Sequence, residues 1–348
     1  MITDTVITPR APTYLLSAMS ADLTYWVARP AEAELRRSIE QAASIVLVYG
    51  ARRMGKSSLV ARALDYARMQ DSATVLTDLG NLSSTEMETI EALYRALAGR
   101  IAGQLRLPID ENRDWDPRYP ASLNFERFVR RRALAGCSGQ LVWAIDNIDR
   151  LVDCSFASDV FGLFRAWHNE RSYSSSGPWT RLTLVIAHAT EPQLFINDPN
   201  QSPFNVGIRI TLENLTVDEI ADLNAKFGLP LQTRQEEVKF RELVAGQPYL
   251  AQRGLCEMAK RKMDFATFAA AAADDDGPYG DHLREFLCQT EQDPALAAEV
   301  RGLLRAKNTL GIDRFYELRS RGLVSGHSAD RARILCEIYR SYLARHLL

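Results

Sequence analysis

Five short runs of apolar, largely β-branched residues punctuate the first 213 residues of the chain. They cover residues 44–50, 74–80, 140–146, 181–189 and 208–212. The runs over residues 140–146 and 181–189 are apolar at nearly every position, which predicts central strands of a parallel sheet, and the other three runs predict further strands. Helices are expected between them, one from Lys56 to about Ala67 and one over residues 83–105 that begins with a serine cap. Beyond residue 213 the pattern is helical to the end, interrupted around residues 272–280, so an α/β domain is followed by helices.

The composition narrows the class of protein without identifying it. The 348 residues are 46% hydrophobic and 25% charged, as in an ordinary globular protein. The formal net charge of -2 argues against wholesale coating of nucleic acid. No apolar run approaches the roughly 20 residues that span a bilayer, and the N-terminus lacks the layout of a signal peptide. The five cysteines form no CxxC pair, which favours reduced thiols and a cytoplasmic protein without a membrane partner.

The first apolar run leads into a glycine-rich segment, GARRMGKSS, at residues 50–58. The segment matches the pattern GxxxxGK[ST] and lies between a predicted strand and a predicted helix, which argues against a fortuitous turn. Its glycines let successive N–H groups point at a phosphate, and the helix N-terminus adds partial positive charge. Lys56 is predicted to reach the β- and γ-phosphates, and the Ser57 hydroxyl to bind Mg²⁺. We therefore expect a nucleotide-binding loop, the P-loop, with contacts from Gly50, Arg52, Arg53, Met54, Gly55, Lys56, Ser57 and Ser58.

The apolar run LVWAID ends in a carboxylate that suits the metal side of such a site. Asp146 at that strand end is predicted to hold Mg²⁺ together with Ser57, although an acid that merely caps the strand is the alternative. The next residue is Asn147, where many hydrolytic proteins of this architecture carry a glutamate that polarises the attacking water. An amide orients water but takes no proton, so turnover is expected to be slow. Asp149 and Glu191 are candidate substitutes.

Several segments together resemble the bacterial AAA-like domain proteins, which are relatives of STAND-type signalling ATPases. The resemblance rests on YWVARPAEAEL (25–35), GARRMGKSSL, AIDNIDRL, HATEPQLFINDPNQSPFNVG (188–207), AGQPYL (245–250), YGDHLREFL (279–287) and the segment from FYELRSRGLV to the end. It implies a P-loop NTPase three-layer sandwich with the phosphate-binding strand in the middle of a parallel sheet. A further strand is expected between that strand and the one ending at Asp146. A helical lid and a winged helix are expected to follow.

The same resemblance assigns domains and further site residues. It implies an N-terminal adenine-side segment (1–40), an ATPase core (41–213), a lid (214–275) and a winged-helix-like domain (276–348), with ATP or ADP and Mg²⁺ as cofactors. Arg29 is placed beside the adenine, Thr190 at the position of a polar γ-phosphate sensor, and Pro248 in the lid turn that faces the nucleotide. His282 and His327 are candidates for a phosphate contact, although a satisfied or solvated histidine fits them better.

Three functions remain open on the sequence. The first is a slowly hydrolysing switch that controls an effector or sensor protein on a separate chain, by analogy in bacterial signalling or antiviral defence. The second is an initiator- or transposition-like ATPase acting on DNA, which the near-neutral charge does not favour, since acids offset Arg314, Arg319 and Arg321. The third is an inert nucleotide-bound scaffold, which Asn147 suggests. A homo-oligomer is left open, with Arg209 as a candidate finger reaching a neighbour's nucleotide.

Overall fold

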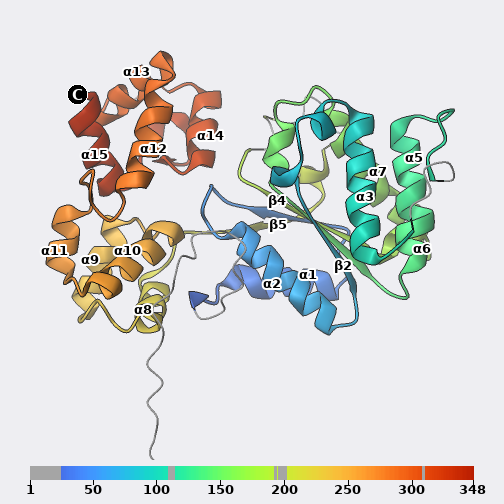
Figure 1. Ribbon diagram of the computed structural model, residues 1–348, viewed down its shortest axis with the longest axis horizontal. Coiled ribbons are helices and arrows are strands. Elements are labelled where there is room, and N and C mark those ends of the chain that lie inside the picture. The colour runs from blue at the N-terminus through green and yellow to red at the C-terminus, as the bar shows by residue number, and fades with distance from the viewer. Residues whose placement is uncertain (1–24, 109–113, 192–193, 195–201, 308–309) are drawn as a thin grey trace, which may run out of the picture.

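The computed structural model describes residues 25–108, 114–191, 194, 202–307 and 310–348. The first 24 residues of the expected N-terminal segment, and residues 192–193 and 195–201 of the segment 188–207, lie outside the described residues. Figure 1 shows two halves, one built on a twisted sheet and one of helices. The five expected strands all form, in the order β2-β3-β4-β1-β5. Their bounds are β1 Ile45–Tyr49, β2 Ala73–Asp78, β3 Leu141–Asp146, β4 Leu182–His188 and β5 Ile208–Thr211.

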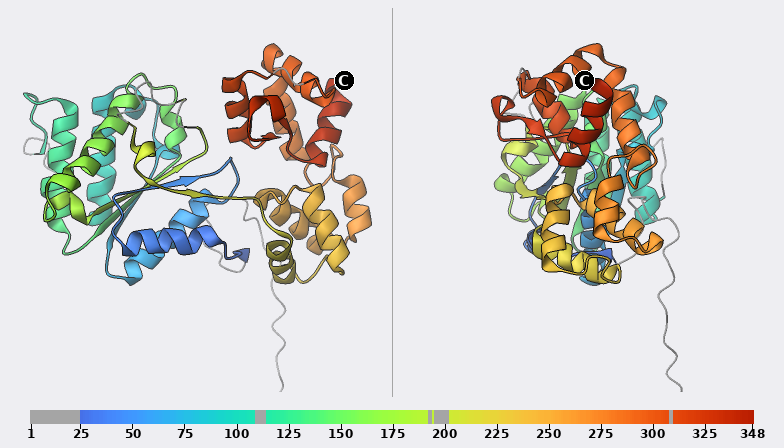
Figure 2. Two further views of the ribbon diagram at one scale, coloured as in Figure 1. Left: turned by 180° about the vertical axis from the view of Figure 1, so that it is seen from behind. Right: turned by 90° about the vertical axis from the view of Figure 1, so that its left-hand side faces the viewer.

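Every neighbouring pair in this sheet is parallel. Side chains therefore alternate between two buried faces: Ile45 and Leu47 of β1 pack on one side, and Val46 and Val48 on the other. The first face is covered by α3 (Ile90–Leu105), α5 (Ala121–Phe128), α6 (Leu134–Gly136) and α7 (Ala157–Tyr173). The second is covered by α1 (Pro30–Glu40) and α2 (Lys56–Met69), as Figures 1 and 2 show. The predicted three-layer α/β sandwich is confirmed.

The strand order corrects one detail of the expected sheet. β4 does lie between β1 and the strand that ends at Asp146, as the resemblance implied. The middle of the sheet, however, is β4 and not the phosphate-binding strand β1. Among the described strands only β5 lies beyond β1, and its exposed residues Ile208, Arg209 and Thr211 form the edge of the sheet.

The helix expected over residues 83–105 begins later than the pattern suggested. Ser83 and Glu86 satisfy each other in a separate turn, in which the Ser83 N–H donates to Glu86 Oε2 at 2.8 Å. That turn leads through a short 3₁₀ segment (Thr85–Met87) to Thr89, whose hydroxyl accepts from the Ala92 N–H at 3.1 Å. The N-cap of α3 is therefore Thr89 and not a serine.

The second half holds eight helices among the described residues. They are α8 (Val217–Lys226), α9 (Arg234–Leu243), α10 (Pro248–Arg261), α11 (Phe265–Ala271), α12 (Gly280–Glu291), α13 (Pro294–Leu304), α14 (Ile312–Arg321) and α15 (Glu337–Leu347). A short antiparallel ladder joins β6 (Val324–Ser325) to β7 (Arg333–Ile334). In the part of the chain that the structure describes, every helix is too short or too polar to cross a membrane. All five cysteines are free thiols.

A single hydrophobic core runs through this helical half, from Leu215 to Leu347. Tyr279 marks the junction between its first four and last four helices: it is fully buried, and its hydroxyl donates to the Leu250 carbonyl at 2.6 Å. The ring of Phe268 packs edge-on against the Tyr279 ring. Helices α8–α11 and α12–α15 are therefore packed as one body, although the chain pattern is interrupted between them.

Candidate nucleotide-binding site

The P-loop is shaped by its two glycines. Gly55 has a φ of +91°, in the left-handed region that side chains rarely adopt, and α2 begins at the next residue. At Gly50 a side chain would approach the Leu212 Cβ to 3.2 Å, closer than most real contacts. The backbone at Gly55 favours glycine, a side chain at Gly50 would crowd Leu212, and the loop presents the N-terminus of α2 to the cavity in front of it.

Lys56 lies folded into this loop. Its Nζ donates to the carbonyl oxygens of Gly50 at 2.8 Å and Ala51 at 2.9 Å. Burial lowers the pKa of this ammonium, while the nearby carboxylates of Asp149 and Asp146 act in the opposite direction. The cation is thus held by neutral carbonyls of its own loop, which anionic phosphate oxygens would replace as stronger acceptors.

Two adjoining cavities meet at the N-terminus of α2. The first, of about 230 Å³, is lined by the aromatic pair Tyr25 and Trp26, by Arg29 and by residues of α2 and the strand ends. The second, of about 910 Å³, is lined by Lys56, Arg52 and Arg53 and by the segments after β2 and β3. Gly55, Ser57, Ser58, Asn147, Pro248 and Gln252 line both. The two cavities therefore form one site with an aromatic end and a cationic end.

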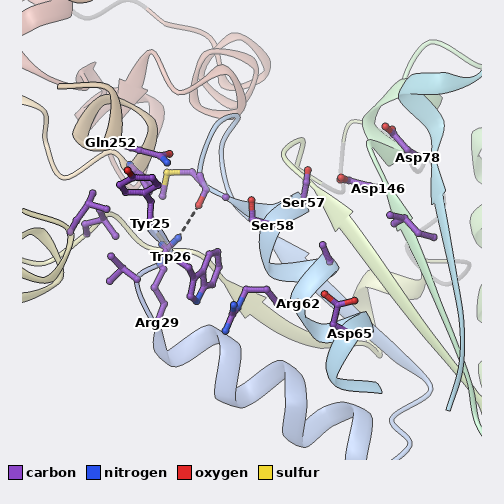
Figure 3. Close-up of a pocket in the computed structure, with 18 of the residues that line it drawn as sticks. Tyr25, Trp26, Arg29, Ser57, Ser58, Arg62, Asp65, Asp78, Asp146 and Gln252 are labelled. Carbon is purple, nitrogen blue, oxygen red and sulfur yellow. Dashed lines mark hydrogen bonds between the residues drawn. The ribbon is translucent and has the colours of Figure 1, made fainter. Parts of the chain in front are cut away.

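Figure 3 shows the aromatic end and the strand ends on opposite sides of the first cavity. Arg29, expected beside the adenine, lines this cavity but is held by backbone oxygens. Its guanidinium donates to the Met54 carbonyl at 2.8 Å and to the Glu213 carbonyl. It ties the segment before α1 to the P-loop and to the connection after β5. The ring of Trp26 lies under the Arg62 guanidinium at 4.9 Å and supplies, with Tyr25, the flat apolar surface of this end.

Asp146 and Ser57 meet at the end of β3. Asp146 is only 6% exposed and accepts a hydrogen bond from the Ser57 side chain. Burial raises the pKa of the Asp146 carboxyl, the hydrogen bonds from Ser57 and the Asn147 N–H oppose this, and the charge of Asp78 raises it further. Within the described residues, no group of three or more His, Cys, Asp and Glu side chains is arranged to hold a metal ion. Ser57 and Asp146 thus offer two oxygen ligands, which suits Mg²⁺ carried largely by phosphates and water.

Asn147 follows Asp146 with a left-handed backbone (φ 54°), which asparagine tolerates better than most residues. Its N–H donates to Asp146 Oδ1 at 2.9 Å, and its side-chain amide donates to Asp78 Oδ1 at 2.7 Å. The amide thus bridges the ends of β3 and β2. Asp78 was not predicted from the sequence, although TVLTD ends in an acid in the same way as LVWAID.

The three remaining candidates near the end of β4 have other partners. Asp149 accepts the N–H groups of Ala189 and Thr190, the latter at 2.7 Å, and so holds the segment after β4. Ala189 lines the larger cavity, whereas Thr190 is absent from the described lining of both cavities. Glu191 is 5% exposed and accepts from Tyr49 and from Arg319 of α14.

The P-loop arginines face the helical half of the molecule. The Arg52 N–H donates to the Ser320 carbonyl at 2.8 Å. Arg53 donates to Glu285 of α12 at 2.8 Å and lies over the Tyr249 ring at 4.6 Å. Beside them, Pro248 lines both cavities at the start of α10. Sequence reasoning named Arg52, Arg53 and Pro248 but gave no sign of the three helices, α10, α12 and α14, that the arginines contact.

Of the two histidines named as phosphate candidates, one is exposed and one lies behind Arg53. His327 is on the surface. His282 is 3% exposed, bonds the Tyr339 hydroxyl at 2.7 Å, and accepts from Arg53. Burial, together with the positive charges of Arg53 and Arg253, lowers the pKa of His282 to about 3. His282 is therefore neutral and already paired in this arrangement.

Comparison with known proteins found a similar sequence and similar folds. An uncharacterized WD repeat-containing protein of Synechocystis is 29% identical over 259 residues, which are 69% of this chain and 20% of that protein. The chain thus spans about a fifth of that relative's length. A Walker-type ATPase of Pyrococcus abyssi has the same fold (TM-score 0.57, 16% identity, 89% of this chain and 95% of that one). Cdc6p of Pyrobaculum aerophilum aligns at a TM-score of 0.48 and 14% identity, over 94% of this chain and 99% of that one.

A family model identifies the family, which the pairwise similarities alone do not. The model of the AAA-like domain matches residues 15–345, which is nearly the whole chain. The match covers the P-loop, the strand that ends at Asp146, and both groups of helices. It agrees with the resemblance that the sequence motifs indicated. The chain belongs to the AAA-like domain family.

Proposed function

We propose that the chain is a nucleotide-operated switch, in which bound ATP or ADP sets the position of the helical half relative to the sheet. A partner, an effector or sensor on a separate chain, is then engaged in one nucleotide state only, in a bacterial signalling or antiviral defence system. The observation that carries the proposal is the contact of Arg52 and Arg53 with the helical half. These residues belong to the P-loop, so whatever occupies the loop acts on the helices directly.

Arg53 is the centre of this contact. Its side chain bonds Glu285 and lies over Tyr249, and its carbonyl accepts from Gln247 Nε2 at 3.2 Å. The Arg53 and Glu285 side chains are 36% and 51% exposed, so their ion pair is a weak one that phosphate competes with easily. A nucleotide that drew Arg53 toward its phosphates would remove these contacts from α12.

A second contact reaches the same edge of the sheet. Arg319 of α14 donates to Glu191, which also accepts from Tyr49 at the end of β1. Arg319 also lies 5.1 Å from the Phe315 ring. In this proposal helices α8–α11 are the lid, and α12–α15 with β6 and β7 are the winged-helix-like domain. The helical half is then linked both to the phosphate loop and to the neighbouring strand ends.

The site residues take definite roles in this function. Tyr25 and Trp26 provide the surface for the base, and Lys56 with the N-terminus of α2 holds the phosphates. Ser57 and Asp146 would hold Mg²⁺, which neutralises phosphate charge when bound. Thr190 is proposed as the polar sensor of the terminal phosphate, which it would contact only after the segment that Asp149 holds has shifted.

The pairing of Arg314, Arg319 and Arg321 supports a protein partner over DNA. Arg314 lies between three acids and bonds Asp293 at 3.0 Å and Glu317 at 2.7 Å. Arg321 donates to Glu317 at 2.6 Å, and Arg319 donates to Glu191. These arginines are therefore neutralised by neighbouring carboxylates. A phosphate backbone would first have to displace those carboxylates, so we place action on DNA second.

Hydrogen–deuterium exchange measured with ADP and with a non-hydrolysable ATP analogue tests the switch. We expect exchange in α12 and α14 to differ between the two states, because only the longer nucleotide competes for Arg53. The substitution Glu285→Gln should shift the ADP state toward the ATP state, whereas Glu291→Gln, on the same helix and exposed, should not. Identical exchange in both states, with both nucleotides shown to bind, would overturn the proposal.

A further inference from the structure

We propose that Asp78, at the end of β2, is the carboxylate that takes the proton from the attacking water, with Asn147 as its positioning residue. This inference rests on the nucleotide binding proposed above and goes beyond it. It replaces the expectation that the chain lacks a base. Asparagine next to Asp146 then does not mean that the site is inert, because the acid stands on the neighbouring strand.

The position of Asp78 follows from the sheet. β2 pairs with β3 in parallel, and in that register Asp78 is directly opposite Asp146. Asp78 lines the first cavity together with Ser57 and Asp146. Figure 3 shows the three side chains following one another along the same side of that cavity. A carboxylate there is one strand away from the metal-side acid.

The hydrogen bonds around Asp78 hold its carboxylate in place. Oδ1 accepts from the Asn147 amide and from the Gly80 N–H, both at 2.7 Å, and Oδ2 accepts from Asn81 at 3.1 Å. The following turn is held by Arg150, which donates to the carbonyls of Leu79 at 2.8 Å and Leu82 at 2.6 Å.

The other nearby acids are less suited to accept a proton. Asp146 is buried, bonded to Ser57 and placed for the metal. Both oxygens of Asp149 accept backbone N–H groups from the segment after β4. Glu191 is buried and engaged by Arg319. Asp78 is half-buried, so water reaches it, and its Oδ2 has a single amide partner that is itself exposed.

The step is an ordinary hydrolysis. The water oxygen forms a bond to the terminal phosphorus while the bond from that phosphorus to the bridging oxygen breaks. ADP leaves with the electron pair of the broken bond. The proton of the water passes to Asp78 and from there to solvent, so the products are ADP, inorganic phosphate and one proton. Asn147 contributes by holding Asp78 Oδ1, so that the orientation of the carboxylate is fixed.

The test compares binding with turnover in the full chain. For Asp78→Asn we expect Mg-ATP affinity by calorimetry to be unchanged or higher, because a negative charge near the phosphates is removed. We expect single-turnover hydrolysis to fall by about 100-fold or more, within the range of general-base catalysis. Glu88→Gln, an exposed acid further along the same segment, is the control and should change neither quantity.

A reciprocal variant separates a chemical role from a structural one. Asp78→Asn combined with Asn147→Asp keeps one carboxylate and one amide in contact but exchanges their places. We expect it to recover at least about tenfold of the rate lost in Asp78→Asn. The assignment would be overturned if the Asp78→Asn variant hydrolysed ATP at the wild-type rate. It would also be overturned if this variant lost both ATP affinity and thermal stability. ATP binding by a wild type that hydrolyses none of it would overturn the base alone, whereas absent ATP binding would overturn the proposed function as well.

Discussion

The P-loop has two sides, and they differ in how firmly they are held. Toward the strand ends, Ser57 bonds a carboxylate that is 6% exposed, and Lys56 is folded into the loop. Toward the helical half, Arg53 and Glu285 form an ion pair that is largely open to water. Breaking the first set leaves a buried charge without a partner, whereas breaking the second costs little. The strand-end side is therefore suited to hold a nucleotide, and the helical side to respond to it.

The largest change is expected from removing the cation on the strand-end side. Lys56→Ala should lower ATP affinity by about 100-fold or more, because charge-assisted bonds to phosphate are lost at a loop whose glycines keep its shape. The fold should survive, since Lys56 bonds only carbonyls of its own loop among its described hydrogen bonds. Isothermal calorimetry measures the affinity, with Lys239→Ala on exposed α9 as the control. An unchanged affinity would contradict the assignment of this loop to phosphate.

Asp146→Ala should separate the metal from the nucleotide on the same side. We expect affinity for Mg-ATP to drop about tenfold more than affinity for ATP in EDTA, because Asp146 acts on the nucleotide through the metal. Asp153→Ala removes an exposed acid that lines the larger cavity and serves as the control. Equal losses with and without Mg²⁺ would place Asp146 elsewhere than on the metal side.

Asn147→Glu distinguishes a missing base from a base on the neighbouring strand. If the site lacks a base, this substitution restores a carboxylate and raises turnover by about tenfold or more. With Asp78 as base, the new carboxylate lies against Asp78, the two share a proton, and turnover falls by a similar factor. Single-turnover hydrolysis measured with saturating nucleotide gives the sign of the change directly.

The smallest effect concerns His282 on the helical side. The folded protein keeps His282 neutral down to about pH 3, whereas the unfolded chain takes up a proton near pH 6.5. Stability is therefore lost as the pH falls below 6.5, by about 1 kcal/mol between pH 6.5 and 5.5. His282→Leu should remove this part of the pH dependence in urea unfolding, whereas His327→Leu, at an exposed position, should leave it unchanged. Equal slopes in both variants would contradict a neutral, buried His282.

The α/β half could be predicted from the sequence because its signals are local. Strands β1, β3 and β4 are nearly continuous apolar runs, and the P-loop pattern fixes the turn between β1 and α2 through Gly55. The start of α3 was missed because Ser83, Thr85 and Thr89 are all acceptable caps. Which of them begins the helix depended on Glu86 turning back to Ser83.

The rest of the site depended on contacts between distant segments. Asp78 can be assigned to the site only when β2 is known to lie beside β3. The order of the strands in the sheet cannot be inferred from the residues of either strand alone. Arg53 and Glu285 are 232 residues apart, and nothing in the P-loop pattern assigns a role to its variable arginines. The position of β1 beside the edge strand was likewise set by the pairing with β5 and not by its own residues.

The undivided core of the helical half makes it a rigid arm. A short connection from Leu212 to Leu215 joins this arm to the sheet. The Leu212 N–H donates to the Tyr49 carbonyl at 2.8 Å, and the Leu215 N–H donates to the Gly246 carbonyl at 2.7 Å. Because one core packs all eight helices, a displacement at Arg53 is expected to move the helical half, including α15, as a unit. The coupling is reciprocal. A protein that binds α15 and favours one position of the helical half changes the affinity for nucleotide by a certain factor, and nucleotide changes the affinity for that protein by the same factor. The proposed switch therefore predicts a shift in ADP affinity at the P-loop when a partner protein is added.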